Sequence, residues 1–206
     1  MPTSPAHPPL PFTPRYPLRT ARLDLRPVTD DDFAAIHAYQ RLPDVCRYLY
    51  WGPFDEAGSR DSVTKKTART TLRTEGDVLQ LAVVVRESGV LVGDVTFAWT
   101  SATHRQASIG YVFHPDHHGH GYATEASRAL LALGFDHLGL HRIQAELDGR
   151  NTASARLLER LGMRREAHLV ENELLDGEWS DEVIYAMLAR EWDALRATDP
   201  QAAPRV

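Results

Sequence analysis

The sequence of 206 residues has one cysteine, no long apolar run and no excess of basic residues. A single cysteine cannot form an internal disulfide or build a cysteine-rich zinc site. No segment approaches 18 consecutive apolar residues, so we predict no transmembrane helix and no membrane partner. A formal charge of -5 and a pI near 6.0 argue against a nucleic-acid-binding protein.

The N-terminus also lacks the apolar stretch of a secretory signal. The composition, 43% hydrophobic and 25% charged, is typical of one globular domain. We therefore expect a soluble cytoplasmic protein.

Prolines are concentrated at the start of the chain, where residues 1–19 hold seven of the 13. Such a stretch lacks backbone donors and an apolar face, so we expect an extended, disordered tail. A proline-rich ligand for a partner protein is the alternative. We predict the folded domain over residues 20–192 and a second tail over residues 193–206.

Hydrophobic periodicity predicts an α/β protein whose strands run in mixed directions. The order of elements differs from the repeated βα units of a Rossmann fold. The expected strands are residues 22–28, 78–86, 90–99, 105–114, 142–147, 167–175 and 183–188. The expected helices are residues 30–43, 55–75, 121–137 and 151–161.

A glycine- and histidine-rich loop follows the strand at 105–114. Gly119 and Gly121 lead directly into a predicted helix, and glycine lets backbone N–H groups turn toward a ligand. The first helical turn adds unpaired donors and a positive dipole end. The loop thus favours a pyrophosphate site. A tight turn without a ligand would use the same residues and stays an alternative.

Other chemistry is less well supported. The chain has neither the Gly-Lys-Ser/Thr of a P-loop nor G-x-G-x-x-G after a strand. It has no HExxH spacing, so we predict no metal site. Cys46 lies among apolar residues, and we expect it to be a buried side chain rather than an acyl-carrying nucleophile.

The helix at 151–161 brings two polar side chains together. Asn151 suits the N-cap, and Ser154 follows one turn later on the same side. Gly162 is placed to end this helix. A well-capped amphipathic helix without any other role is the alternative interpretation.

The strand at 167–175 combines leucines with carboxylates. Strict alternation would put Leu169, Glu171, Glu173 and Leu175 on one face. Two neighbouring carboxylates could raise each other's pKa, as a general base requires, although a solvated strand face is the alternative. The stretch 171–182 has six acidic and no basic residues, so it would attract an ammonium-bearing substrate unless its charges simply surround a turn.

Four segments, in this order, resemble the GNAT N-acyltransferase superfamily in its RimJ/RimL-like branch. They are Thr-Ala-Arg-Leu-Asp-Leu-Arg-Pro-Val-Thr at 20–29, Gly-His-Gly-Tyr-Ala-Thr-Glu-Ala at 119–126, Asn-Thr-Ala-Ser-Ala-Arg-Leu-Leu-Glu-Arg-Leu-Gly-Met at 151–163, and Asp-Gly-Glu-Trp-Ser-Asp followed by Tyr-Ala-Met-Leu at 176–188. The resemblance implies a GNAT-like α/β fold: a mixed, mostly antiparallel central sheet of about seven strands flanked by helices.

The resemblance also implies a reaction. The expected enzyme moves an acetyl group from acetyl-CoA to a primary amine by direct attack, without a metal. The acceptor would be a protein N-terminal α-amine or a small-molecule amine. A larger acyl group such as succinyl, and a non-catalytic acyl-CoA sensor or scaffold, are the alternatives. Exposed sheet edges also make a homodimer possible.

Site residues follow from the resemblance position by position. Ser154 matches the proposed general acid beside the CoA sulfur, Glu173 the candidate base, and Glu171 a residue that binds or orients the amine. Asn151 would bond the pantetheine arm. His118 replaces the usual Gln or Arg of the loop. The remaining residues expected at the acyl-CoA are Tyr111, Val112, Phe113, Gly119, His120, Gly121, Tyr122, Ala123 and Thr124.

Overall fold

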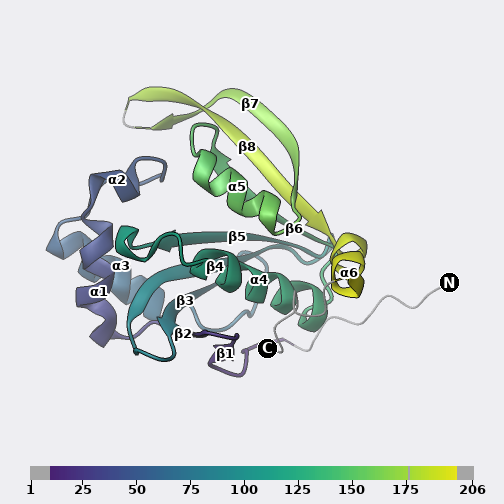
Figure 1. The fold of residues 1–206 in the computed structure, drawn as a ribbon, viewed down its shortest axis with the longest axis horizontal. Helices are drawn as coiled ribbons and strands as arrows, with labels where there is room; N and C mark the ends of the chain where they lie inside the picture. The colour runs from purple at the N-terminus through teal and green to yellow at the C-terminus, as the bar shows by residue number, and fades with distance from the viewer. Residues whose placement is uncertain (1–9, 176, 199–206) are drawn as a thin grey trace.

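A computed structural model describes residues 10–175 and 177–198, in which eight strands form a single sheet (Figure 1). The spatial order is β1-β2-β3-β4-β5-β6-β8-β7. The strands are β1 (Leu18–Arg19), β2 (Leu23–Pro27), β3 (Val78–Val85), β4 (Leu91–Ser101), β5 (Gln106–Phe113), β6 (Arg142–Asp148), β7 (Arg164–Leu175) and β8 (Glu178–Leu188). The predicted mixed, mostly antiparallel α/β sheet is confirmed, with β1 as one strand more than expected.

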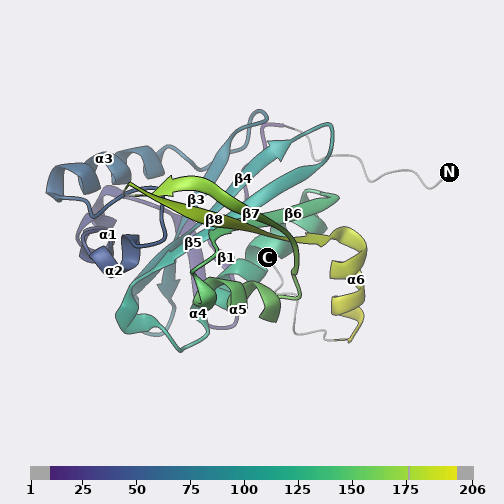
Figure 2. The same ribbon diagram turned by 90° about the horizontal axis from the view of Figure 1, so that it is seen from above.

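Helices connect these strands. They are α1 (Phe33–Gln40), α2 (Pro43–Cys46), α3 (Glu56–Thr67), α4 (Tyr122–Ala132), α5 (Thr152–Arg160) and α6 (Ala189–Thr198), with 3-10 turns η1 (Asp30–Asp32) and η2 (Pro115–His117). A π-helical turn, η3 (Leu133–His137), continues α4. The two views place α1–α3 on one side of the sheet and α4 with α5 on the other (Figures 1 and 2).

The only parallel neighbours in this sheet of described strands are β5 and β6. They pair over just three positions, Gln106 to Ser108 with Arg142 to Gln144. Beyond that point β5 pairs with β4 alone, as far as Phe113. The facing parts of the two strands, residues 109–113 and 145–148, therefore diverge. We call this opening the β5–β6 split.

The core lies mainly between the sheet and α4, α5 and α6. Phe97, Leu130 and Trp192 are fully buried there. A smaller cluster under α1 and α3 contains Ile36 and Val63. Burial of such side chains stabilises the fold by about 1.5–3 kcal/mol each.

A buried polar network joins the second layer to the sheet. Asp94 of β4 accepts hydrogen bonds from Lys66 Nζ and Gln80 Nε2, each at 2.5 Å, and from the hydroxyl of Tyr39. The carboxylate is 2% exposed, so these partners supply the stabilisation that water would otherwise give. The network fixes the position of α1 and α3 relative to β3 and β4.

The expectation of a disordered tail over 1–19 is wrong for residues 10–19. Phe12 exchanges backbone hydrogen bonds with Leu72, and Leu18 is buried on β1. Tyr16 donates to the carbonyl of Thr70 at 2.9 Å. Apolar side chains between the prolines give this segment a face to bury. Residues 1–9 lie outside the described part of the chain.

Two further boundaries differ from prediction. The expected C-terminal tail begins inside α6, which continues to Thr198, while residues 199–206 lie outside the described part. The helix predicted to reach residue 75 ends at Thr67. The residues after it extend instead, because Leu72 pairs with the N-terminal segment.

Candidate active site

Two helix N-termini border the β5–β6 split. Helix α4 follows β5 and α5 follows β6, and both pack on the same side of the sheet (Figure 1). The first N–H groups of a helix have no partner within the helix and lie at its positive dipole end. The open edge of β5 adds backbone N–H and C=O groups. The split is thus lined by donors suited to an anionic, amide-containing ligand.

The loop before α4 has the backbone conformation that its glycines predicted. Gly119 and Gly121 have φ of +79° and +78°, in the left-handed region. A Cβ placed on Gly119 would meet nothing within 4 Å, so its positive φ, rather than a lack of space, is what favours glycine there. This geometry fits a pyrophosphate bound by the backbone N–H groups of the loop and the first turn of α4.

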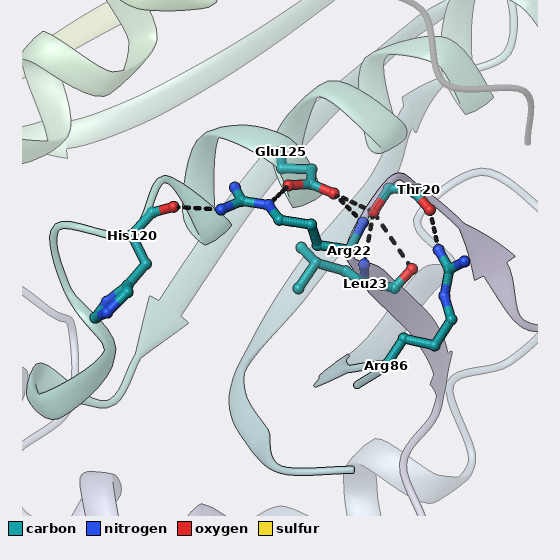
Figure 3. A network of polar contacts seen from close by, with 6 residues as sticks. All are labelled: Thr20, Arg22, Leu23, Arg86, His120 and Glu125. Carbon is teal, nitrogen blue, oxygen red and sulfur yellow. Dashed lines mark hydrogen bonds and ion pairs between the residues drawn. The ribbon is translucent and has the colours of Figure 1, made fainter. Parts of the chain in front are cut away.

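A network of charged groups holds this loop from behind (Figure 3). The guanidinium of Arg22 donates to Glu125 Oε2 at 2.7 Å and to the carbonyl of His120 at 2.9 Å. Glu125 Oε1 also accepts from Thr20 Oγ1 at 2.6 Å and from the Arg22 backbone N–H at 2.8 Å. The N-terminal segment is therefore tied directly to the loop and to α4.

The charge of Glu125 is balanced within this network. Burial by itself would raise the pKa of Glu125, but the hydrogen bonds from Thr20 and Arg22 and the Arg22 charge outweigh it and lower the pKa. The Arg22 guanidinium also lies 4.9 Å from the centre of the Tyr122 ring. An ion-paired carboxylate repels a bound anion less than an unpaired one would.

His118 contributes through its side chain to the start of the loop. Its Nε2 lies 3.2 Å from the carbonyl oxygen of Phe113, so the ring ties the loop to the end of β5. Neighbouring His120 contacts the His118 carbonyl at 2.9 Å. Within residues 10–175 and 177–198, no three His, Cys, Asp or Glu side chains are arranged to hold a metal ion.

Ser154 lies in the first turn of α5. Its backbone N–H donates to Asn151 Oδ1 at 3.1 Å, which confirms Asn151 as the N-cap of this helix. Its hydroxyl lies 2.5 Å from the hydroxyl of Tyr111 on β5. Ser154 and Tyr111 therefore meet across the split, on the side of α4 and α5.

Carboxylates gather on the opposite side of the sheet. Residues paired across neighbouring strands share a face, and Glu182 of β8 pairs with Asp148 of β6. Glu146 shares that face by alternation along β6. Ser180, two residues before Glu182, pairs with Glu173 of β7. We call Glu146, Asp148, Glu173 and Glu182 the acidic face.

Glu182 is the carboxylate of the acidic face whose pKa is raised. Its residue is 7% exposed, and Asn172 Nδ2 donates to its Oε2 at 2.7 Å. Burial, followed by the charges of Glu146 and Glu173, raises the pKa of Glu182. Tyr50, from the loop after α2, lies near the same charges. Burial and, to a smaller extent, the negative charges of the acidic face raise the pKa of Tyr50 to about 12.

The predicted alternation along β7 is wrong at Glu171. The pairing between β7 and β8 shifts between Leu169 and Glu173, and Glu171 has a φ of +50° in this bulge. Its backbone N–H donates to Asp181 Oδ1 at 2.9 Å, and its side chain is exposed. Glu171 thus leaves the alternating pattern, and its role toward an amine stays a prediction.

The acetyltransferase (GNAT) domain family matches residues 22–164, a span that includes the loop, α4, α5 and most of the split. The chain belongs to this GNAT family. It is similar to an uncharacterized N-acetyltransferase, YnaD of Bacillus subtilis, with 33% identity over 85% of this chain and 99% of the relative. The protein is accordingly an N-acetyltransferase.

Solved GNAT structures have the same fold. The crystal structure of a GNAT acetyltransferase from Bacillus anthracis has a TM-score of 0.75 and 34% identity, over 84% of this chain and 98% of that one. A more distant curated relative is the spermidine N(1)-acetyltransferase of Escherichia coli K12, 22% identical over 86% of this chain and 91% of the relative.

Sequence reasoning did not single out every residue of this GNAT site. Glu182 was expected only as one of a run of acids, and Glu146 and Asp148 were not identified. The sequence contains a pattern that could have identified them, because the apolar residues Ile143, Ala145 and Leu147 alternate with polar ones. The structure shows these three side chains buried, which leaves Glu146 and Asp148 on the other face. Tyr50 had no such signal, since only the tertiary fold brings its loop to the acidic face.

Cys46 and the helices can also be compared with the sequence expectations. Cys46 is 4% exposed and its Sγ hydrogen-bonds the Gln40 carbonyl at 3.3 Å, which confirms the expected burial. Among the described residues of this GNAT protein, no helix has the length and hydrophobicity needed to cross a membrane.

Proposed function

We propose that this protein transfers the acetyl group of acetyl-CoA to a primary amine of a positively charged acceptor, in the manner of the RimJ/RimL-like branch. The observation that carries the proposal is the two-sided β5–β6 split. Ser154 lies on one side, together with the N-termini of α4 and α5, and the acidic face lies on the other. An amine can therefore approach from one side while the thiol leaves toward the other.

The donor side fits CoA. The backbone N–H groups from Gly119 to Thr124 would hold the pyrophosphate, and the open edge of β5 at Tyr111, Val112 and Phe113 would pair with the pantetheine amides. GNAT acetyltransferases use acetyl-CoA, which supplies a thioester whose carbonyl carbon accepts the amine. A β5 N–H is suited to polarise that carbonyl.

The acceptor side supplies a base. A lysine-like amine has a pKa near 10.4 and an α-amine about 7.7–8.0, so a proton must be removed before or during attack. Glu173 and Glu182 are coupled by their charges, and we assign the base to this pair. The nitrogen–carbon bond forms as the carbon–sulfur bond breaks, and the Ser154 hydroxyl stabilises the sulfur that leaves.

The acidic face also supports a cationic acceptor. Glu146, Glu173, Glu182 and the aromatic ring of Tyr50 are suited to bind ammonium groups, whereas Asp148 is already ion-paired with Arg150 at 2.7 Å. The spermidine N(1)-acetyltransferase relative favours a small polyamine, whereas the RimJ/RimL-like resemblance favours a protein N-terminus. Both acceptors carry positive charge, so both agree with this surface.

Calorimetry and a thiol-release assay together test the proposal. The wild-type protein is titrated with acetyl-CoA, CoA and succinyl-CoA, and release is then measured with polyamines, other small amines and N-terminal peptides. We expect tight binding of acetyl-CoA and thiol release with one class of amine. Binding without release from any amine would favour a sensor, and absence of binding would contradict the assignment of the loop.

Variants then test the assigned residues. Ser154→Ala should lower kcat with little effect on the Kd for CoA. Combined Glu173→Gln and Glu182→Gln should lower kcat/KM for the amine by at least about a hundredfold, as expected for loss of a general base. Wild-type turnover in the combined variant would exclude the acidic face as the base. The cytoplasmic location and the homodimer stay predictions from the sequence.

A further inference from the structure

The contact between Tyr111 and Ser154 joins two elements that are far apart in the sequence. Tyr111 projects from β5 and Ser154 from the first turn of α5. The hydroxyl oxygens lie 2.5 Å apart, and the Tyr111 hydroxyl is also 3.4 Å from the Ser154 carbonyl oxygen. Tyr111 is half-buried, so little water competes for this contact.

Both the backbone N–H and the side-chain hydroxyl of Ser154 therefore have fixed partners. Its backbone N–H is bound by the Asn151 side chain, and its Oγ is held by Tyr111. A serine in a helix usually bonds a backbone carbonyl of the preceding turn, which points its hydrogen along the helix. Here the Tyr111 phenol, acting as donor, occupies one lone pair of Ser154 Oγ. The hydroxyl hydrogen of Ser154 is therefore available to another group.

We propose that Tyr111 is a positioning residue for acyl transfer: its phenol donates to Ser154 Oγ and directs the serine hydrogen toward the departing sulfur. The inference rests on the proposed function and adds a role for the Tyr111 side chain, separate from the role of its backbone on the β5 edge. It assigns no covalent chemistry to the tyrosine.

The direction of the hydrogen bond follows from acidity. Burial raises the pKa of Tyr111 to about 12, although the Ser154 contact and the Arg160 charge oppose the increase. The phenol therefore stays protonated at neutral pH, and because a phenol O–H is more acidic than an alcohol O–H, we assign Tyr111 as the donor in its contact with Ser154 Oγ. Donors in a chain polarise one another, so a serine that accepts from Tyr111 becomes the better donor to sulfur.

The balance of protons is consistent with this role. As the carbon–sulfur bond breaks, the sulfur keeps the electron pair and accepts a hydrogen bond from Ser154. A thiol with a pKa near 8.5 cannot take the proton of a phenol at about 12 without a large cost, so Tyr111 keeps its proton. The acceptor ammonium gives up one proton before attack and a second as the amide forms; Glu173 and Glu182 accept these protons in turn and pass them to solvent, from which the thiolate takes its proton.

A double-mutant cycle tests the coupling. Tyr111→Phe should lower kcat about tenfold, the effect of losing one hydrogen bond, with less than a twofold change in KM for acetyl-CoA. In the Ser154→Ala background the same substitution should have no further effect on kcat. Tyr185→Phe is the matched control, because its hydroxyl donates to Glu159 on the same helix at 3.0 Å, yet kcat should stay unchanged.

A second measurement does not depend on turnover. The thiol pKa of bound CoA is read from thiolate absorbance during a pH titration of the complex. In the wild-type complex it should lie below that of free CoA, because Ser154 stabilises the thiolate. Tyr111→Phe and Ser154→Ala should each move it toward the free value, whereas Tyr185→Phe should not.

The outcomes separate this inference from the proposed function. A normal kcat and an unchanged thiol pKa in Tyr111→Phe would overturn the inference while Ser154→Ala still impairs transfer. Independent, additive effects of the two substitutions would also overturn it. Failure of the wild-type protein to transfer acetyl to any amine would instead contradict the proposed function, and the thiol titration would still report on the Tyr111–Ser154 contact.

Discussion

Glu182 combines a destabilising environment with the role of a base that we propose for it. The carboxylate is buried beside Glu146 and Glu173, and its pKa is raised by this burial and by both charges. In the folded state it is therefore harder to ionise than in the unfolded chain. A raised pKa costs stability as the pH rises above the unfolded value near 4.3, and it makes the carboxylate a stronger base near neutral pH.

Replacing Glu182 by Gln should raise the melting temperature at pH 7 by about 2–4 °C, corresponding to roughly 1 kcal/mol in a protein of this size. The gain should shrink toward pH 4, where the folded wild type is already protonated. The acid limb of the kcat/KM profile should lie above the ordinary range of a glutamate carboxyl in the wild type, because the pKa of Glu182 is raised. Thermal melts and pH profiles check both statements, with the exposed Glu87→Gln as control. A lower melting temperature at pH 7 would refute this reasoning.

Arg22 and Glu125 allow a second test at this scale. Arg22→Ala and Glu125→Gln should each weaken CoA binding about tenfold, since both release the loop before α4. The double variant should lose less than the product of the single effects, because the two groups act as one unit. Arg19→Ala, on an adjacent exposed ion pair with Asp24, is the control. Calorimetric titration with CoA measures the affinity of all four variants. Independent losses of affinity in the two single variants would argue that Arg22 and Glu125 do not act as one unit.

Among the elements, α4, α5 and the strands were predictable because their apolar periodicity matches the faces they bury. Asn151 was identified as a cap for the same local reason. The bulge in β7 was not predictable, because the alternation of residues 169–175 looks regular in the sequence and nothing local marks where the pairing shifts. The short strand β1 was hidden by the prolines around it. The β5–β6 split depends on where two distant strands stop pairing, which no local pattern encodes.

The β7 bulge makes a prediction about Glu171. A non-glycine residue with a positive φ is strained, so Glu171→Gly should stabilise the protein by about 0.5–1 kcal/mol. The acceptor KM should rise if Glu171 orients the amine and stay unchanged if it does not. Glu171→Ala keeps the strain while removing the charge, so it separates the two effects. Denaturant titration and steady-state kinetics supply the readouts; a destabilised Gly variant would show that the Glu171 backbone is not strained.

At the scale of the whole molecule, the proposed reaction brings two substrates of opposite charge to a protein of net charge -5. In this proposal, backbone donors and the α4 dipole would bind the anionic donor locally. The acidic face and the overall negative charge would attract the cationic acceptor over a longer range. Exposed charges are screened by salt over about 10 Å at 0.1 M, so the two affinities should respond differently.

Raising the ionic strength from about 0.05 to 0.5 M should increase KM for a multiply charged amine severalfold and change kcat little. KM for acetyl-CoA should change less, since its binding depends on short backbone hydrogen bonds. A singly charged amine is the control and should show a smaller increase than the polyamine. Steady-state kinetics at fixed pH decide the matter, and equal salt responses of the two amines would argue against a role for the acidic face.

The three residue pairs that join β5 to β6 have a mechanical consequence. On one side of this junction stand β1 to β5 with α4, and on the other stand β6, β8 and β7 with α5. A ligand seated in the split would act as a short extra strand and fasten the two halves to each other. The sheet would then be more rigid when acetyl-CoA is bound. Slower amide hydrogen exchange along β5 and β6 would therefore report that the enzyme holds acetyl-CoA.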